Sequence, residues 1–329
     1  MSQSLKPIAQ DQAWQQLTKM SEALPQGVIV VGPSGVGKRR TIKALFQYIN
    51  CLAGGDTQET SLFTGASAPQ ALSAETLKPC GGCLMCRKIA EDKHADYIEI
   101  SPKGETIAVD DLREMKKTLY FAPMEGKYRF IVIDDAHKMG AASANNLLKT
   151  LEEPPAHTRF FLITHERGLL LPTIVSRCQF VHFAPLARDA IATLLERMGL
   201  EIPQALLPLC LDLMGGGLSR ATLLSDEKTL SFLENAERAL SGGASKRWEQ
   251  IVELADALGS DEWKLELFLD MLVRLSHRNA LAARQNEQAH EHADLALAAS
   301  HLRRRLDRYA NKKLIALAAA DLSTGAPRS

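Results

Sequence analysis

A glycine-rich turn near the start of the chain carries residue types that bind phosphate. The segment Gly32-Pro-Ser-Gly-Val-Gly-Lys38 follows a short apolar run and precedes a helical pattern. Glycines let the backbone approach a ligand, and the unpaired amides at a helix N-terminus attract anions. Lys38 adds a positive charge that can reach the outer phosphates of a nucleotide. This context favours a nucleotide pocket over a plain strand-to-helix turn, with Gly32, Gly35, Gly37 and Lys38 as its members.

Two positions near this pocket depart from what ATP hydrolysis requires. The residue after Lys38 is normally a serine or threonine whose hydroxyl holds Mg²⁺, but here it is Arg39, which cannot ligate a cation. Asp134 directly follows the apolar run 128–133, and it matches the aspartate of a Walker B segment whose carboxylate faces Mg²⁺. Asp135 stands where active ATPases of this architecture usually carry a glutamate that polarises the attacking water.

Both departures affect the same reaction. Asp135 is one methylene shorter than glutamate, and a displacement of about 1 Å can lower a rate roughly 10²-fold. We therefore predict a degenerate pocket in which ATP binding is doubtful and hydrolysis is poor or absent. The alternative is that Asp134 and Asp135 are strand-end acids that cap the next helix.

Four cysteines have the spacing of a metal site. Cys80, Cys83 and Cys86 form a Cys-x-x-Cys-x-x-Cys cluster, and Cys51 lies at the end of the helical pattern that follows the glycine-rich turn. Because the first residues show no secretion signal, such a cluster indicates metal binding rather than disulfides. Four thiolates fit a structural Zn²⁺ with no open coordination position. An iron–sulfur cluster or a redox role remains the alternative.

Five short apolar runs predict the strands that position these residues. They lie at 27–31, 97–100, 128–133, 159–164 and 179–183. Helical segments lie between them, including 110–120, with Asp110 as its N-cap, and 141–152, which ends before two prolines. Alternating strands and helices predict an α/β fold with a parallel five-stranded sheet and crossover helices.

Strand signals end after Pro185, and helical patterns follow, such as the apolar spacing within 251–258. We therefore place an α/β domain at 1–185, a small helical domain at 186–226 and a second helical domain at 227–329. The length of 329 residues is ample for these parts at roughly 150 residues per domain.

The overall composition excludes several classes of protein. Basic and acidic residues number 39 each and 46% of residues are hydrophobic, which disfavours both disorder and a uniformly basic nucleic-acid coat. No apolar run approaches the roughly 18 residues of a membrane span. We expect a soluble, cytoplasmic protein without membrane contact.

Two further blocks give the chain a family resemblance. They are Ala144-Asn-Asn-Leu-Leu-Lys-Thr-Leu-Glu-Glu-Pro-Pro155 and Thr173-Ile-Val-Ser-Arg-Cys178. With the cysteine cluster, they resemble the subunits of bacterial DNA polymerase III clamp loaders, which are AAA+ proteins. The resemblance covers essentially the whole chain and implies an AAA+ domain with a zinc module at 51–90, a helical lid and a helical collar that joins subunits.

The resemblance also implies roles for single residues. Arg177 would be an arginine finger that enters the ATP site of a neighbouring subunit. Thr164 matches the position called sensor 1, and Arg220 matches sensor 2. The cysteine cluster matches the family's zinc module. Because ATP-hydrolysing loader subunits share the two blocks, the departures at Arg39 and Asp135 are what resemble the non-hydrolysing delta-prime subunits. The alternative is a gamma/tau-like motor subunit.

A clamp-loader role further implies the partners of the chain. These would be the gamma/tau and delta subunits, the beta sliding clamp through the complex, and primer–template DNA bound without sequence specificity. DNA-directed nucleotidyltransferase activity would belong only to the polymerase III holoenzyme, with no independent ATPase activity in this subunit. A basic stretch at 303–313 faces DNA or an acidic partner, or is simply a solvated helix face.

Overall fold

The computed structural model describes residues 8–52, 79–165, 167–241, 266–274, 277, 293–294 and 296–301. The chain divides into two compact units, Met1–Ala190 and Ile191–Ser329. The apolar pattern expected within 251–258 and the basic stretch at 303–313 lie outside the described residues.

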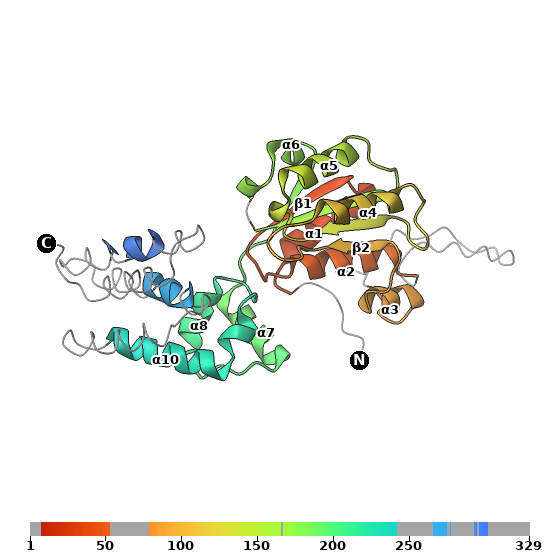
Figure 1. The fold of residues 1–329 in the computed structure, drawn as a ribbon. Helices are drawn as coiled ribbons and strands as arrows, with labels where there is room; N and C mark the ends of the chain where they lie inside the picture. The colour runs from red at the N-terminus through yellow and green to blue at the C-terminus, as the bar shows by residue number, and fades with distance from the viewer. Residues whose placement is uncertain are drawn as a thin grey trace. The chain divides into compact units, whose positions relative to one another are not determined.

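The first unit is built on a five-stranded, fully parallel sheet (Figure 1). Its strands are β1 (Gly27–Val31), β2 (Tyr97–Ile100), β3 (Arg129–Ile133), β4 (Thr158–Thr164) and β5 (Gln179–His182). The strand order is β2-β3-β4-β1-β5. All five predicted strands are confirmed to within one residue at each end. The three central strands are buried throughout, as expected of strands covered on both faces.

Helices connect the strands and cover the sheet. They are α1 (Asp11–Met20), α2 (Lys38–Asn50), α3 (Leu84–Ala90), α4 (Val109–Leu119), α5 (Ala141–Glu152) and α6 (Pro172–Val175), with 3₁₀ turns η1 (Ser21–Ala23), η2 (Ala136–Lys138) and η3 (Arg167–Leu169). The predicted helix at 141–152 is confirmed. The predicted N-cap at Asp110 is wrong, because the cap residue of α4 is Ala108 and Asp110 instead pairs with Arg113 at 2.8 Å in the first turn.

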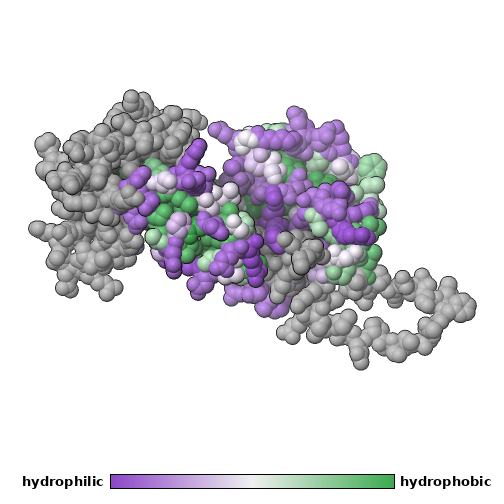
Figure 2. Space-filling view, turned by 90° about the horizontal axis from the view of Figure 1, so that it is seen from below, coloured by the Kyte–Doolittle hydropathy of each residue, from purple (hydrophilic) through white to green (hydrophobic). Residues whose placement is uncertain are grey.

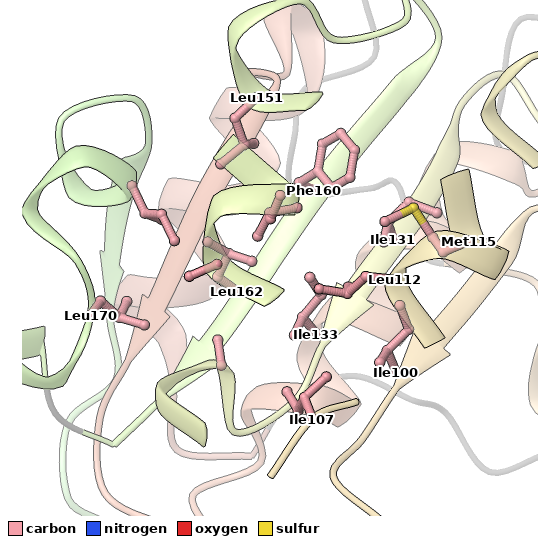
Figure 3. Close-up of a cluster of buried hydrophobic side chains, with 14 of the residues drawn as sticks. Ile100, Ile107, Leu112, Met115, Ile131, Ile133, Leu151, Phe160, Leu162 and Leu170 are labelled. Carbon is pink, nitrogen blue, oxygen red and sulfur yellow. The ribbon is translucent and has the colours of Figure 1, made fainter. Parts of the chain in front are cut away.

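The alternation of side chains along the strands gives the sheet two separate apolar faces. On one face, Ile131 and Leu162 pack with side chains of α4 and α5, such as Leu112 and Leu147 (Figure 3). On the other face, Phe46 of α2 lies against strand residues, including Phe130 at 4.8 Å between ring centroids. This two-sided core holds the carboxyl ends of the strands in register, and the candidate site residues follow those ends.

A buried ion pair fixes the segment between α4 and β3. The Asp96 carboxylate and the Arg129 guanidinium lie 3.2 Å apart with almost no exposure. Asp96 accepts hydrogen bonds from the backbone amides of 124–126, and Arg129 donates to the backbone carbonyls of Thr118, Phe121 and Ala122. The Asp96 carboxylate and the Arg129 guanidinium therefore provide hydrogen-bond partners for many backbone groups of the segment between α4 and β3.

The described part of the second unit is helical. Its elements are α7 (Arg188–Met198), which begins at the end of the first unit, α8 (Leu207–Met214), α9 (Ala221–Leu224) and α10 (Glu227–Ser241), with further helical residues at 266–274.

The surface of the described residues is mainly hydrophilic on the face shown in Figure 2, with smaller hydrophobic patches between the hydrophilic residues. Among the residues that the structure describes, no helix is long and apolar enough to cross a membrane.

Candidate nucleotide pocket and metal centre

The glycine-rich turn joins β1 directly to α2, as a phosphate loop requires. Gly35 and Gly37 have φ angles of +78° and +88°, a backbone region that favours glycine. At Gly32 a Cβ atom would lie 2.4 Å from the backbone oxygen of Phe183, so any side chain would collide with the segment after β5. The turn therefore needs glycine at these three positions whether or not a ligand is bound.

Lys38 is the first residue of α2, and its side chain turns back onto the loop. Its ammonium group donates to the backbone oxygens of Gly32 and Pro33, at 2.5 and 2.6 Å. Burial lowers the pKa of Lys38, although the nearby Asp134 and Asp135 carboxylates oppose this shift. The charge predicted to meet phosphate is thus held by the loop's own carbonyl groups, and a nucleotide would have to displace them.

Arg39 pairs with a residue of β2, the edge strand on the opposite side of the sheet from β5. Its guanidinium lies 2.9 Å from Oε1 of Glu99 on β2, with 60% of the arginine side chain exposed. Burial raises the pKa of Glu99, the charge of Arg39 opposes this, and Asp134 raises it further. A fixed cation thus sits among the carboxylates at this edge, and position 39 offers no oxygen to Mg²⁺. These residues do not fit the usual Mg²⁺ site of a phosphate loop.

The two aspartates after β3 have different environments. Asp134 accepts a hydrogen bond from the backbone amide of Asp135 at 3.0 Å. Asp135 has a left-handed backbone, with φ at +46°, and its carboxylate pairs with Lys138 at 3.0 Å. Asp135 precedes η2, but its side chain makes no capping hydrogen bond to that turn. The helix-capping alternative is therefore wrong for Asp135.

Thr164 ends β4 beside this pair and is fully buried. Its hydroxyl lies 3.3 Å from Nδ1 of His137, whose ring meets the His165 ring edge to face at 4.2 Å between centroids. Burial lowers the pKa of His137, and His165 lowers it further. Neither histidine stood out in the sequence. The available signal was only that each follows the end of a predicted strand; the structure shows that these two strands, β3 and β4, are neighbours.

Arg177 lies on the surface of the first unit, just after α6. Its guanidinium donates to the backbone oxygen of Thr173 at 3.0 Å and pairs with Glu152 at 2.8 Å. Glu152 is the last residue of α5 and belongs to the Leu-Glu-Glu-Pro-Pro segment. Sequence reasoning missed the contact between Glu152 and Arg177, because 25 residues separate them.

Arg220 belongs to the second unit and precedes α9. Its guanidinium lies 2.5 Å from a carboxylate oxygen of Asp270, and both side chains are largely buried, at 29% and 21% exposed. This ion pair joins two segments of the second unit. The role of Arg220 as a sensor residue stays a prediction.

The structure brings the four predicted cysteine ligands together. Cys51 follows the last residue of α2, and Cys83 precedes α3. All four sulfur atoms lie within 4.8 Å of one another, and those of Cys80 and Cys86 are 4.0 Å apart. Tetrahedral Zn²⁺ with Zn–S bonds of about 2.3 Å needs sulfur separations of roughly 3.8 Å. The cluster therefore has the composition and the size to hold zinc.

Backbone amides also point at these sulfurs, as they would at thiolates. The amides of Cys80, Cys83 and Cys86 donate to the sulfurs of Cys51, Cys80 and Cys83, at 3.2 to 3.4 Å. Hydrogen bonds from the amides of Cys83 and Gly82 lower the pKa of Cys80 to about 6, whereas burial raises that of Cys86. The amide donors favour the charged form that a metal ion requires.

Comparison with known proteins shows to which family the chain belongs. A family model described as "DNA polymerase III, delta subunit" matches residues 9–187. DNA polymerase III subunit tau of Salmonella typhimurium is 34% identical over 204 residues, which are 61% of this chain and 28% of that protein. Subunit gamma/tau of Mycobacterium tuberculosis is 32% identical over 198 residues, which are 58% of this chain and 30% of that protein. The chain thus matches less than a third of the length of these relatives.

A solved structure shares the fold over nearly the whole chain. It is a DNA polymerase III gamma subunit-related protein from Thermotoga maritima, with 18% identity, a TM-score of 0.55, and coverage of 96% of this chain and 100% of that one. This likeness and the parallel five-stranded sheet confirm the predicted AAA+ fold. Because the family model covers more than half of the 329 residues, the chain belongs to the DNA polymerase III delta subunit family of clamp-loader proteins.

Proposed function

We propose that this chain is the delta-prime subunit of a DNA polymerase III clamp loader. In this role it does not hydrolyse ATP, and it donates Arg177 to the ATP site of a neighbouring subunit. The single observation that carries the proposal is Arg39, which is paired with Glu99 and stands at the position where an active subunit has a Mg²⁺-binding hydroxyl.

The rest of the pocket supports the absence of hydrolysis. The Lys38 ammonium group donates to carbonyl groups of its own loop, so its hydrogen-bond donors are already engaged. The Asp135 carboxylate is shorter than glutamate and is paired with Lys138. The loop therefore keeps the shape of a nucleotide pocket without the groups that activate water and hold Mg²⁺.

Arg177 has the properties expected of an arginine finger. Its side chain is 37% exposed, so it can meet a neighbouring subunit. Within this chain the guanidinium contacts the Thr173 carbonyl and the Glu152 carboxylate. Such a finger stabilises the charge of the transferring phosphoryl group and can raise the rate about 10³- to 10⁵-fold.

The cysteine cluster adds a structural zinc ion to this proposal. Cys51, Cys80, Cys83 and Cys86 would hold it with four thiolates and no open position for chemistry. The ion would join the end of α2 to the start of α3.

The proposed partners follow from the loader assignment. They are the gamma/tau and delta subunits, the sliding clamp and primed DNA through the complex, and the work of the subunit would take place in the cytoplasm. Nucleotidyl transfer would belong to the polymerase holoenzyme as a whole.

The test is ATP turnover by a reconstituted loader with clamp and primed DNA. The other subunits are combined with this chain, with its Arg177→Ala variant, or with Arg113→Ala, which removes another exposed arginine that has an ion pair. We expect the wild type and Arg113→Ala to stimulate turnover, and Arg177→Ala to assemble while stimulating at least about 10²-fold less. Equal stimulation by an assembled Arg177→Ala complex would exclude the finger.

A second candidate is an ATP-hydrolysing motor subunit, favoured by the similarity to tau and gamma/tau proteins. It predicts that the isolated chain hydrolyses ATP and that Lys38→Ala abolishes the activity. No hydrolysis by the isolated chain would leave the delta-prime assignment as the better one.

A further inference from the structure

Two histidines and an aspartate gather at the carboxyl edge of the sheet, beside the nucleotide pocket. Asp135 and His137 follow β3, and His165 follows β4, the adjacent parallel strand. One potential ligand atom of each side chain lies within 4.8 Å of those of the other two. We propose that these three side chains form a second metal site, which binds a divalent transition-metal ion. This proposal does not depend on which loader subunit the chain is.

The donor set decides which metal ions fit. Two imidazole nitrogens and one carboxylate oxygen suit Zn²⁺ and similar ions, and such a set leaves further coordination positions open. Mg²⁺ instead prefers about six oxygen ligands in a near-octahedral arrangement. The site therefore differs in ligand chemistry from the Mg²⁺ site of an ATPase, although it uses the carboxylate at the water-activating position.

The surrounding backbone and side chains already position two of the three ligands. Asp135 has the left-handed φ of +46°, which is uncommon for a residue other than glycine, and its backbone oxygen accepts a hydrogen bond from the Lys138 amide. Nδ1 of His137 lies 3.3 Å from the hydroxyl of Thr164, which is fully buried. A histidine that binds a metal through one nitrogen usually has a hydrogen-bond partner on the other, and Thr164 supplies one.

Binding requires two adjustments that the exposure of the residues permits. The three ligand atoms must move to roughly 3.3 Å from one another, because metal–ligand bonds of about 2.0 to 2.2 Å require this spacing. His165 is exposed, so its ring can move the furthest. Lys138 must leave Asp135, but both side chains of that ion pair are about two-fifths exposed, at 38% and 41%, and ion pairs of this exposure are weak.

The test uses the full chain with zinc already bound to its cysteines and its metal content measured. Titration with Zn²⁺ by calorimetry should reveal one further equivalent per chain. His165→Ala should weaken this second equivalent at least tenfold without affecting the fold, because the side chain is exposed. His137→Ala should weaken it equally. Millimolar Mg²⁺ should not compete.

The matched control is His157→Ala, which removes an exposed histidine before β4 that lies outside the three-residue group. The His157→Ala variant should still bind the second equivalent of Zn²⁺. A Co²⁺ titration should add visible absorption without sulfur-to-metal charge transfer, which separates this site from the cysteines. The proposal is overturned if no second equivalent binds, if His165→Ala binds it as tightly as wild type, or if His157→Ala loses it as well.

Discussion

Lys38 and Arg39 are adjacent in sequence, yet each is held by a different part of the first unit. Lys38 is buried against the carbonyl groups of its own loop, and Arg39 extends to Glu99 on the edge strand β2. Only Arg39 is paired with a carboxylate, whereas neutral carbonyl oxygens bind the Lys38 ammonium group. Both side chains are therefore already bonded within the protein where a nucleotide and its Mg²⁺ would need them.

Replacing Arg39 with threonine tests this interpretation directly. Arg39→Thr supplies the missing hydroxyl and frees Glu99, so we expect Mg²⁺-dependent nucleotide binding to tighten at least about tenfold, or about 1.4 kcal/mol. Titration with a fluorescent ATP analogue, with and without Mg²⁺, measures the change. Arg39→Ala is the control, since it removes the guanidinium but adds no hydroxyl. Equal affinities of the two variants would show that the hydroxyl is not what the pocket lacks.

Most residues of the candidate site could be predicted one at a time, but their partners could not. The phosphate-loop residues and the four cysteines stand at short, regular spacings, which a sequence displays directly. Glu99, Glu152 and His165 are far along the chain from the residues they meet. Only the order of the strands brings them close, and the sequence does not state that order.

At the scale of elements, the prediction succeeded where burial leaves an unbroken apolar run. The three central strands are such runs, and their bounds were predicted to within one residue. The bounds of the partly exposed edge strands β2 and β5 were predicted equally well from shorter apolar runs. The N-cap of α4 was predicted wrongly because an aspartate at a helix start suits the first turn as well as the cap. A local preference cannot separate adjacent positions when two of them are favourable.

The segment between α4 and β3 gives a stability prediction. Burial raises the pKa of Asp96, but the amides of 124–126 and Arg129 more than offset this, so its pKa in the folded protein lies below the ordinary value. Asp96→Asn leaves the Arg129 charge buried without its partner. We expect the free energy of unfolding to fall by about 3 kcal/mol, measured by urea denaturation at pH 7.

The pH dependence of this loss has a definite sign. Because the pKa of Asp96 is lowered on folding, its contribution is complete above the unfolded value of about 3.9 and disappears as the pH falls through the folded value. The difference between wild type and Asp96→Asn should therefore shrink below about pH 4. Asp110→Asn changes a carboxylate that is 84% exposed and should alter stability by less than about 0.5 kcal/mol. A constant difference down to pH 2 would contradict this account.

At the scale of the whole molecule, the cysteine cluster ties together segments of the first unit that are distant in sequence. Cys51 and Cys80 are 29 residues apart, yet the Cys80 amide donates to the Cys51 sulfur at 3.2 Å. If the cluster holds zinc, Cys83→Ser should reduce the zinc content by about one ion per chain and lower the thermal midpoint of the first unit by several degrees. Metal analysis and calorimetry measure both effects.

The control for zinc content is Cys210→Ser, because Cys210 belongs to the second unit and is not one of the four cysteines of the cluster. It should leave the zinc content unchanged. Full zinc content in Cys83→Ser would show that the four cysteines do not act as one ligand set.

Helix α2 begins at Lys38 and is followed at once by Cys51, so its two ends serve two different sites. Adding or deleting one residue inside it would turn one end by about 100° relative to the other and shift it by about 1.5 Å. Related proteins that keep both sites must therefore keep the length of this helix. The stretch between Cys51 and Cys80 supplies no further cysteine between its two ends, so the two sites do not restrict its length in this way. Insertions and deletions among related proteins should therefore occur between Cys51 and Cys80 and be absent from α2.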